Sequence, residues 1–182
     1  MLSEAPFSFS TSRRNKSYCV YPCPCGYFSD PQKSCTCAPA VVTRYQKRIS
    51  GPLLDRIDIH IEVPRVDYEK LTSDRVGESS ESIRQRVQAA RDRQTARYAN
   101  SDSKHVVSNA DMRVKEIREY CKLDEQSQIV MRSAMTQLQL SARAYHRILK
   151  LARTIADLGG SDEIQPTHLA EALQYRPKIM VG

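Results

Sequence analysis

One short run of alternating residues constrains the fold of this 182-residue chain more than any other feature. Between Ile57 and Val63 every second residue is Ile or Val, and the residues between them are Asp58, His60 and Glu62. A period of two is typical of a β-strand with one buried face. A single strand cannot pair its own backbone N–H and C=O groups. We therefore expect its partner strands either in the N-terminal residues or in a segment outside this sequence.

Most of the remaining sequence is predicted to be helical. Apolar residues recur at helical spacing over residues 40–49, 81–98, 109–120, 124–138, 141–158 and 167–175. Gly159 and Gly160 are expected to end the helix that starts at Ser141, and Pro166 is expected to open the next one. The pattern predicts a short strand-bearing part followed by an all-helical domain.

Four segments are expected along the chain. Residues 1–21 are polar and rich in serine, so we predict that they are disordered. Residues 22–66 contain a loop rich in cysteine and proline and the alternating run. Residues 67–79 form a polar linker, and residues 80–182 form the helical domain.

Composition excludes a membrane protein and leaves several partners open. No apolar run approaches the roughly 20 residues of a membrane-spanning helix, and the N-terminus lacks the apolar core of a signal peptide. We expect a cytoplasmic protein whose six cysteines are thiols or metal ligands. The net charge of +7 suits an acidic partner such as nucleic acid or a nucleotide phosphate, and equally suits a merely soluble protein.

Four of the cysteines form two C-x-C pairs that nine residues separate, and they are Cys23, Cys25, Cys35 and Cys37. Four thiolates could close a tetrahedral zinc site. The spacing is unusual, because zinc sites generally place two residues between paired cysteines. A loop of reduced, partly buried cysteines is the alternative.

The predicted helix from Ser141 has one basic face. Arg143, Arg147 and Lys150 lie at i, i+4 and i+7, opposite apolar residues. Arg143 falls in the first turn, where free N–H groups and the helix dipole favour an anion, so it could hold a phosphate. A solvated basic face is the alternative.

Arg56 lies between the pair Leu53–Leu54 and the alternating run. A cation held on both sides has little freedom, and such rigidity suits an arginine that neutralises charge on a transferred phosphoryl group. Pairing of Arg56 with Asp55 or Asp58 is the alternative.

The sequence lacks the motifs of a complete nucleotide hydrolase. It contains no G-x-x-x-x-G-K-[ST] loop and no apolar strand that ends in Asp-Glu to hold magnesium. Five arginines border an apolar stripe within residues 81–98, at positions 84, 86, 91, 93 and 97. We expect their heads to lie in water, with a nucleic-acid contact as the alternative.

Three long stretches carry a resemblance to a known family: PCPCGYFSDPQKSCTCAP, RYQKRISGPLLDRIDIHIEVP and LSARAYHRILKLARTIADLGGSDEIQPTHLAEALQYR. From about Pro22 to Met180 the chain resembles the C-terminal portion of magnesium-chelatase-like AAA+ ATPases of the ComM (YifB) type. The resemblance implies an α+β fragment dominated by α, in which the last strand of an αβα core precedes a helical lid. Residues 1–21 would not belong to the family.

The resemblance also implies roles for single residues. Arg56 matches the family's arginine finger, which reaches the γ-phosphate of a neighbouring subunit's ATP. Arg143 matches the sensor-2 arginine, which contacts phosphate within its own subunit. Tyr21 stands where the family commonly has a sensor-1 asparagine, and a tyrosine cannot supply the same amide groups.

Whole relatives resemble hexameric, ATP-driven motors that act on DNA in branch migration and natural transformation. The implied cofactors are ATP and Mg²⁺, held by the full-length protein, with Zn²⁺ if the cysteines bind a metal. The implied partners are neighbouring subunits and DNA. The chain alone is expected to be inactive. A non-catalytic helical module that binds DNA or a protein, or a small zinc-binding module, is the alternative.

Overall fold

The structure is a computed structural model, and it describes residues 7–11, 16–54, 56–63, 66, 68, 77–99 and 105–176. The chain divides into two compact units, Met1–Leu54 and Asp55–Gly182. The expected boundary after residue 66 stays a prediction, and the segment from Arg56 onward bonds to residues of the second unit. Most of the predicted linker 67–79 lies outside the described residues.

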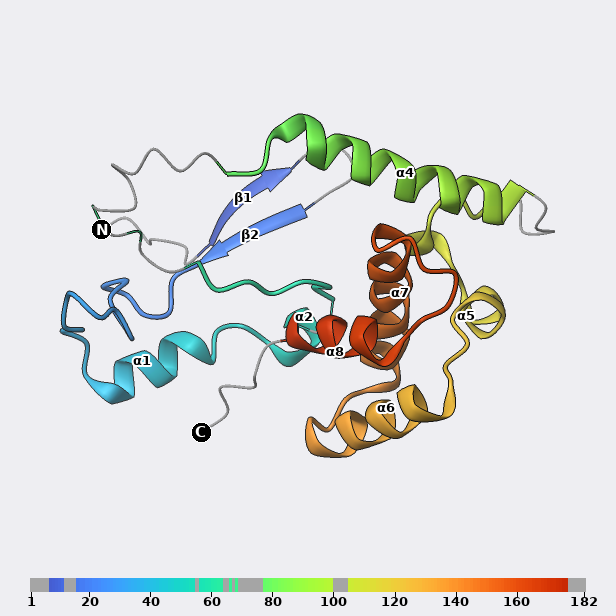
Figure 1. Cartoon of the computed structure of the whole chain (residues 1–182). Helices are drawn as coiled ribbons and strands as arrows, with labels where there is room; N and C mark the ends of the chain where they lie inside the picture. The colour runs from blue at the N-terminus through green and yellow to red at the C-terminus, as the bar shows by residue number, and fades with distance from the viewer. Residues whose placement is uncertain are drawn as a thin grey trace. The chain divides into compact units, whose positions relative to one another are not determined.

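The first unit contains a hairpin, a cysteine-containing loop and two short helices (Figure 1). Strands β1 (Phe7–Thr11) and β2 (Lys16–Val20) pair antiparallel, with Phe9 opposite Tyr18. Helix α1 (Pro39–Gln46) starts with a proline, and α2 (Gly51–Leu54) is a single turn. The prediction of disorder is wrong for residues 7–11 and 16–20, which form strands. Their aromatic residues and Val20 favour this conformation.

The alternating run from Ile57 to Val63 does not form the predicted strand. Within the described ranges no strand pairs with it, and its backbone bonds go to the C-terminal end of the helical unit. The His60 N–H donates to the carbonyl of Tyr175 at 2.9 Å, and Arg176 donates to the carbonyl of Ile57 at 3.3 Å. Without a partner strand the side of the run that was predicted to be buried stays largely open, and Ile61 and Val63 are 70% and 85% exposed.

The second unit is helical, as predicted (Figure 1). It contains α4 (Ser80–Ala99), the 3₁₀ turn η1 (Asn109–Asp111), α5 (Val114–Tyr120), α6 (Glu125–Gln137), α7 (Ala142–Leu158) and α8 (Pro166–Gln174). The helix predicted over residues 109–120 is interrupted between Asp111 and Val114. Met112 and Arg113 have extended ψ angles there, and the Glu116 side chain accepts the Arg113 N–H at 2.8 Å to start a new helix.

Helix α7 lies at the centre of this unit and contributes the buried residues Ile148, Leu149, Ala152 and Ala156. Leu169 and Ala172 of α8, Met131 of α6 and Ile117 of α5 belong to the same apolar core. Burial of this stripe, rather than helix propensity, supplies most of the stability of such helices. None of the helices in the described part of the chain is long and apolar enough to cross a membrane.

Both ends of α7 are fixed by its own sequence. At its start the Ser141 hydroxyl accepts the Ala144 N–H at 3.1 Å. At its end Gly160 has a φ of +74°, and the Ser161 N–H donates to the Ala156 carbonyl at 2.8 Å. The bond from Ser161, together with one from the Gly160 N–H to the Asp157 carbonyl at 3.2 Å, forms a Schellman motif, whose left-handed residue is normally glycine.

A buried ionic network joins α7 to α4 and η1. The side chain of Asp157 is fully buried and pairs with Arg153 and Arg97. It also accepts from Asn109 Nδ2 at 2.8 Å, while Tyr98 donates to Asn109 Oδ1 at 2.7 Å. Burial by itself raises the pKa of Asp157, but hydrogen bonds from Arg97 and Asn109 and the two guanidinium charges outweigh it and lower that pKa.

Candidate functional site

Arg143 lies in the first turn of α7, directly after the cap that Ser141 provides. Its side chain is exposed, and no described residue forms a hydrogen bond or ion pair with its guanidinium. The first N–H groups of any α-helix have no partner within the helix, and the dipole makes that end positive. The binding of a phosphate at this helix end stays a prediction.

The other two cations of the predicted basic face are used within the protein. Arg147 donates through one Nη atom to the carbonyl of Arg56 at 2.8 Å and to Asp58 at 2.5 Å. Lys150 donates to the carbonyl of Ala110 at 2.8 Å, and burial, followed by the nearby charge of Arg147, lowers its pKa. Of the three, Arg143 alone has a side chain without a partner in the described part of the chain.

Arg56 stands in an exposed turn at the start of the second unit. Asp58, one of its two expected partners, pairs with Arg147 instead, and Asp55 lies outside the described residues. Within the ranges that the structure describes, the Arg56 guanidinium has no partner. Its backbone carbonyl, in contrast, is fixed by Arg147.

The anchoring of Arg56 differs from the sequence prediction. We expected a leucine pair on one side and a strand on the other, whereas the segment after Arg56 is held by bonds to Arg147, Arg176 and Tyr175. Sequence reasoning missed Arg147 as an anchor, although its position one helical turn after Arg143 was a signal that both face the same way. The result is a chain of contacts from the candidate phosphate-binding helix to the candidate finger segment.

The basic border of α4 is mostly paired within the molecule. Ion pairs join Arg84 to Glu81, Arg86 to Glu78, Arg93 to Asp162 and Arg97 to Asp157. Arg91 is the one of these five arginines whose guanidinium has no partner among the described residues. Whether this border of α4 also contacts nucleic acid stays a prediction.

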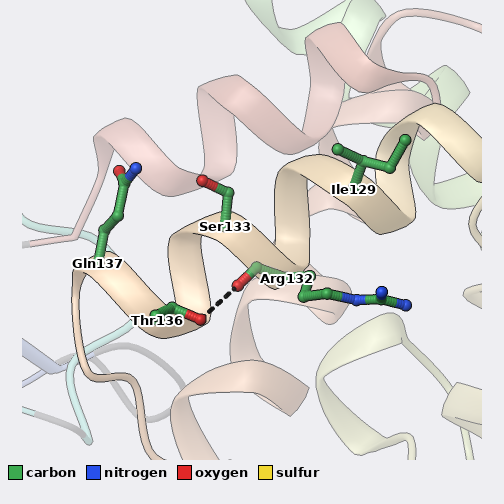
Figure 2. A pocket seen from close by; sticks show the side chains of 5 residues that line it. All are labelled: Ile129, Arg132, Ser133, Thr136 and Gln137. Carbon is green, nitrogen blue, oxygen red and sulfur yellow. Dashed lines mark hydrogen bonds between the residues drawn. The ribbon is translucent and has the colours of Figure 1, made fainter.

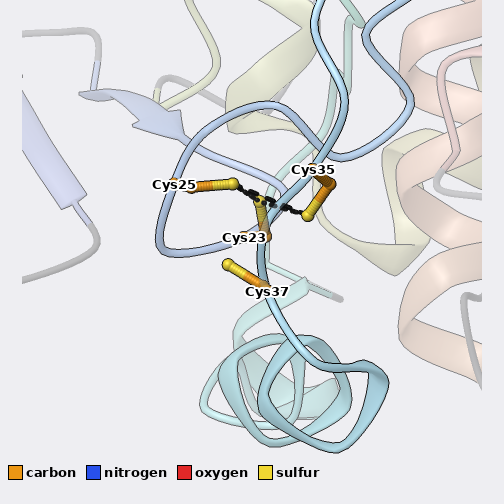
Figure 3. A group of neighbouring side chains, drawn as sticks. All are labelled: Cys23, Cys25, Cys35 and Cys37. Atoms are coloured by element: carbon orange, nitrogen blue, oxygen red, sulfur yellow. Dashed lines mark hydrogen bonds between the residues drawn. The ribbon is translucent and has the colours of Figure 1, made fainter.

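The four clustered cysteines come together in the loop of the first unit, as the sequence predicted they could (Figure 3). Their sulfur atoms all lie within 4.8 Å of one another. The Sγ of Cys23 is 3.3 Å from that of Cys25 and 3.7 Å from that of Cys35, and the last two are 3.5 Å apart. Cys23 is fully buried. Such a group could hold a metal ion.

Tyr21, at the expected sensor-1 place, is 62% exposed and lies beside the same loop. A Cβ added to Gly26 would lie 3.5 Å from Cδ1 of Tyr21, and Gly26 has a φ of +81°. The ring of Tyr21 therefore covers the glycine turn of the cysteine loop.

Two hollows on the described surface of the helical unit are open to solvent. One lies along a single face of α6, where Ile129, Arg132, Ser133, Thr136 and Gln137 line it (Figure 2). Another lies between α5, α6 and α7 and includes Arg118, Lys122 and His146. Neither hollow includes Arg56 or Arg143.

Two family models match the chain. The model described as magnesium chelatase, subunit ChlI C-terminal, matches residues 77–176. The chain belongs to the magnesium chelatase ChlI family. A second model of the magnesium chelatase family, described as subunit ChlI, matches residues 14–71. That match begins inside residues 1–21, which we had expected to fall outside the family, and it includes the cysteine loop and Arg56.

Relatives in the magnesium chelatase family confirm the predicted resemblance to the ComM (YifB) type. The chain is 41% identical to the competence protein ComM of Haemophilus influenzae over 160 residues, or 87% of this chain and 30% of ComM. It is 41% identical to YifB of Escherichia coli over 85% of this chain and 29% of YifB. An uncharacterized protein of Mycobacterium bovis is 33% identical over 85% of this chain. The chain thus spans about 30% of the length of these curated relatives.

Proposed function

We propose that this chain is the C-terminal portion of an AAA+ ATPase, in which Arg56 acts as the arginine finger and Arg143 as the sensor-2 arginine. The observation that carries the proposal is the connection between the two. The side chain of Arg143 projects from α7 and has no partner among the described residues. Arg147, one turn later on α7, holds the backbone of Arg56. Membership of the magnesium chelatase family supports the same assignment.

Arg143 would bind a phosphate of the nucleotide held by its own subunit. The helix end, capped by Ser141, adds N–H groups and a positive dipole to the guanidinium charge. A phosphate that attracts Arg143 would therefore pull on α7 as a rigid body. Because Arg147 belongs to the same helix, a movement of α7 would reach the segment that carries Arg56.

Arg56 would act on the nucleotide of a neighbouring subunit. Its guanidinium is exposed while its backbone is held, and this combination suits a cation that must be presented outward in a fixed position. A finger of this kind stabilises charge on the transferred phosphoryl group and is worth about 10³ to 10⁵ in rate. The ring-shaped assembly that such a role requires is part of the proposal.

ATP and Mg²⁺ would be bound mainly by other parts of the protein. Magnesium prefers carboxylate and water oxygens, and the one group of three or more metal-binding side chains in the described ranges consists of cysteines. The sequence also lacks a phosphate-binding loop. This chain would contribute Arg56 and Arg143 to the site and would not hydrolyse ATP by itself.

The whole protein would be a cytoplasmic, hexameric motor that acts on DNA during natural transformation. ComM is named as a competence protein, and the 41% identity between this chain and ComM supports this part of the proposal.

A mixing experiment tests the role of Arg56. ComM of Haemophilus influenzae, with the arginine that aligns with Arg56 replaced by alanine, is combined with this chain, and ATP hydrolysis is measured. We expect the wild-type chain to raise hydrolysis at least tenfold, as one supplied finger contributes orders of magnitude.

The Arg56→Ala chain should raise hydrolysis no more than buffer does. Arg44→Ala, which removes another exposed arginine, is the matched control and should behave as wild type. Equal results for wild type and Arg56→Ala would overturn the proposal.

A further inference from the structure

The cysteine cluster plays no part in the proposed nucleotide chemistry and needs its own explanation. We propose that Cys23, Cys25, Cys35 and Cys37 bind one zinc ion in a closed, structural four-thiolate site. The site would belong to the first unit and would hold its loop and α1 together. It would supply no chemistry to ATP hydrolysis.

The sulfur positions match a single tetrahedral metal. A Zn–S bond of about 2.3 Å and tetrahedral angles require sulfur atoms about 3.8 Å apart. Three of the pairs are 3.3, 3.5 and 3.7 Å apart, and all four sulfurs lie within 4.8 Å of one another. A disulfide needs about 2.05 Å, and all four cysteines are free thiols in the structure. One central ion explains a four-membered group better than two separate pairs.

Backbone N–H groups surround the sulfur atoms. Hydrogen bonds from the amides of Tyr27 and Thr36 reach the Cys25 sulfur. The Cys25 amide bonds to Cys37, and the Cys37 amide bonds to Cys35. The two C-x-C segments therefore donate N–H groups to each other's sulfurs as well as to their own.

The left-handed turn at Gly26 makes this possible despite the unusual spacing. Gly26, with a φ of +81°, donates its N–H to the Cys23 carbonyl at 3.0 Å. This tight turn brings Cys23 and Cys25 to the same side of the loop with one residue between them. It answers the objection that zinc sites generally place two residues between paired cysteines.

A zinc ion would also stabilise the described part of the first unit, in which Cys23 and Val42 are the buried apolar residues. A structural zinc site supplies folding free energy directly, because the unfolded chain does not present a formed site.

The ligand set selects zinc over other common metals. Four thiolates in tetrahedral geometry suit Zn²⁺ or iron, while magnesium and calcium prefer oxygen. Four protein ligands fill the coordination sphere and leave no position for water, which is the arrangement of structural rather than catalytic zinc. In a cluster with several irons the sulfurs would bind different metal atoms, which a group this compact does not favour.

Metal analysis of the purified full chain tests the proposal. We expect about one zinc per chain by mass spectrometry and, after exchange into Co²⁺, the intense charge-transfer absorption of a cobalt–thiolate centre. Cys35→Ala should lose both signals, whereas Cys121→Ala, which removes a cysteine of the helical unit, should keep them. Zinc well below one per chain without the cobalt absorption, or iron in place of zinc when both metals are supplied, would overturn the assignment.

Thiol protection keeps the test decisive if Cys35→Ala fails to fold. The wild-type chain is treated with an alkylating reagent with and without bound zinc, and the labelled peptides are identified. We expect zinc to slow labelling of the four clustered cysteines at least tenfold and to leave Cys19 unchanged. Equal labelling of the cluster in both states would contradict the proposal. Because the assay needs no nucleotide, its outcome is independent of the roles proposed for Arg56 and Arg143.

Discussion

Arg147 is a residue whose two contacts hold the segment that follows Arg56. It bonds to the Arg56 carbonyl and to Asp58, and its side chain is 28% exposed. An ion pair this open to solvent contributes only about 0.2–1 kcal/mol to global stability. Its effect should therefore be local: it should keep the segment in place without adding much to the stability of the helical unit.

We predict that Arg147→Ala loosens residues 56–63 while the helices stay folded. The measurement is hydrogen exchange, in which the His60 amide, bonded to Tyr175, should exchange at least several-fold faster. The buried part of α7 should exchange at the wild-type rate. Arg143→Ala, which removes a neighbouring arginine without a partner in the described ranges, is the control and should leave the His60 amide unchanged. Equal protection of this amide in wild type and Arg147→Ala would show that Arg147 does not anchor the segment.

At the scale of single elements, the helices could be predicted from local sequence and the strand could not. The start of α7 at Ser141 and its end at Gly160 are written in residues that cap or terminate a helix wherever they occur. A strand depends on a partner that local sequence does not supply, so the run from Ile57 to Val63 pairs with no strand in the described chain. The hairpin at residues 7–20 was missed because its strands are short and rich in serine.

The same distinction holds for the candidate site. The positions of Arg143 and the four cysteines followed from spacing along the chain. The bonds from Arg147 to Arg56 and Asp58 join residues 89 or more apart, and the partners of Arg153 and Asp157 depend on how α4 and η1 pack on α7. Such contacts are set by tertiary packing, which residue spacing does not encode.

The end of α7 offers a test of the capping argument. Gly160→Ala should destabilise the chain by roughly 1–2 kcal/mol, because a side chain disfavours the left-handed φ of +74°. Gly159→Ala is the control, since Gly159 has a φ of −78° and an added Cβ would make only ordinary van der Waals contacts, at 3.5 Å or more. Its effect should be near zero. Thermal unfolding followed by circular dichroism measures both, and equal melting temperatures for the two variants would contradict the Schellman assignment.

At the scale of the whole molecule, the helical unit combines an apolar core with one buried charge centre. Asp157 forms ion pairs with Arg153 and Arg97, of which Arg153 is almost fully buried, and also accepts a hydrogen bond from Asn109. Removing one partner from a buried ion pair costs about 3–5 kcal/mol, because the remaining charge is left uncompensated. Three separate segments, α4, η1 and α7, meet at this carboxylate, so its loss should weaken the whole unit and not a single helix.

Asp157→Asn should therefore lower the free energy of unfolding by about 3–5 kcal/mol at neutral pH. Asp162→Asn is the control and should change this free energy little, because the Asp162 side chain is 97% exposed.

The pH dependence of the stability gives a further check. Because its partners lower the pKa of Asp157 in the folded state below its ordinary 3.8, the stability it contributes is fully present above that value. It is lost as the pH falls through the lower, folded-state pKa. The difference between wild type and Asp157→Asn, measured by urea unfolding, should shrink on acidification, and a difference that stays constant to low pH would mean that the Asp157 carboxylate is not the stabilising charge.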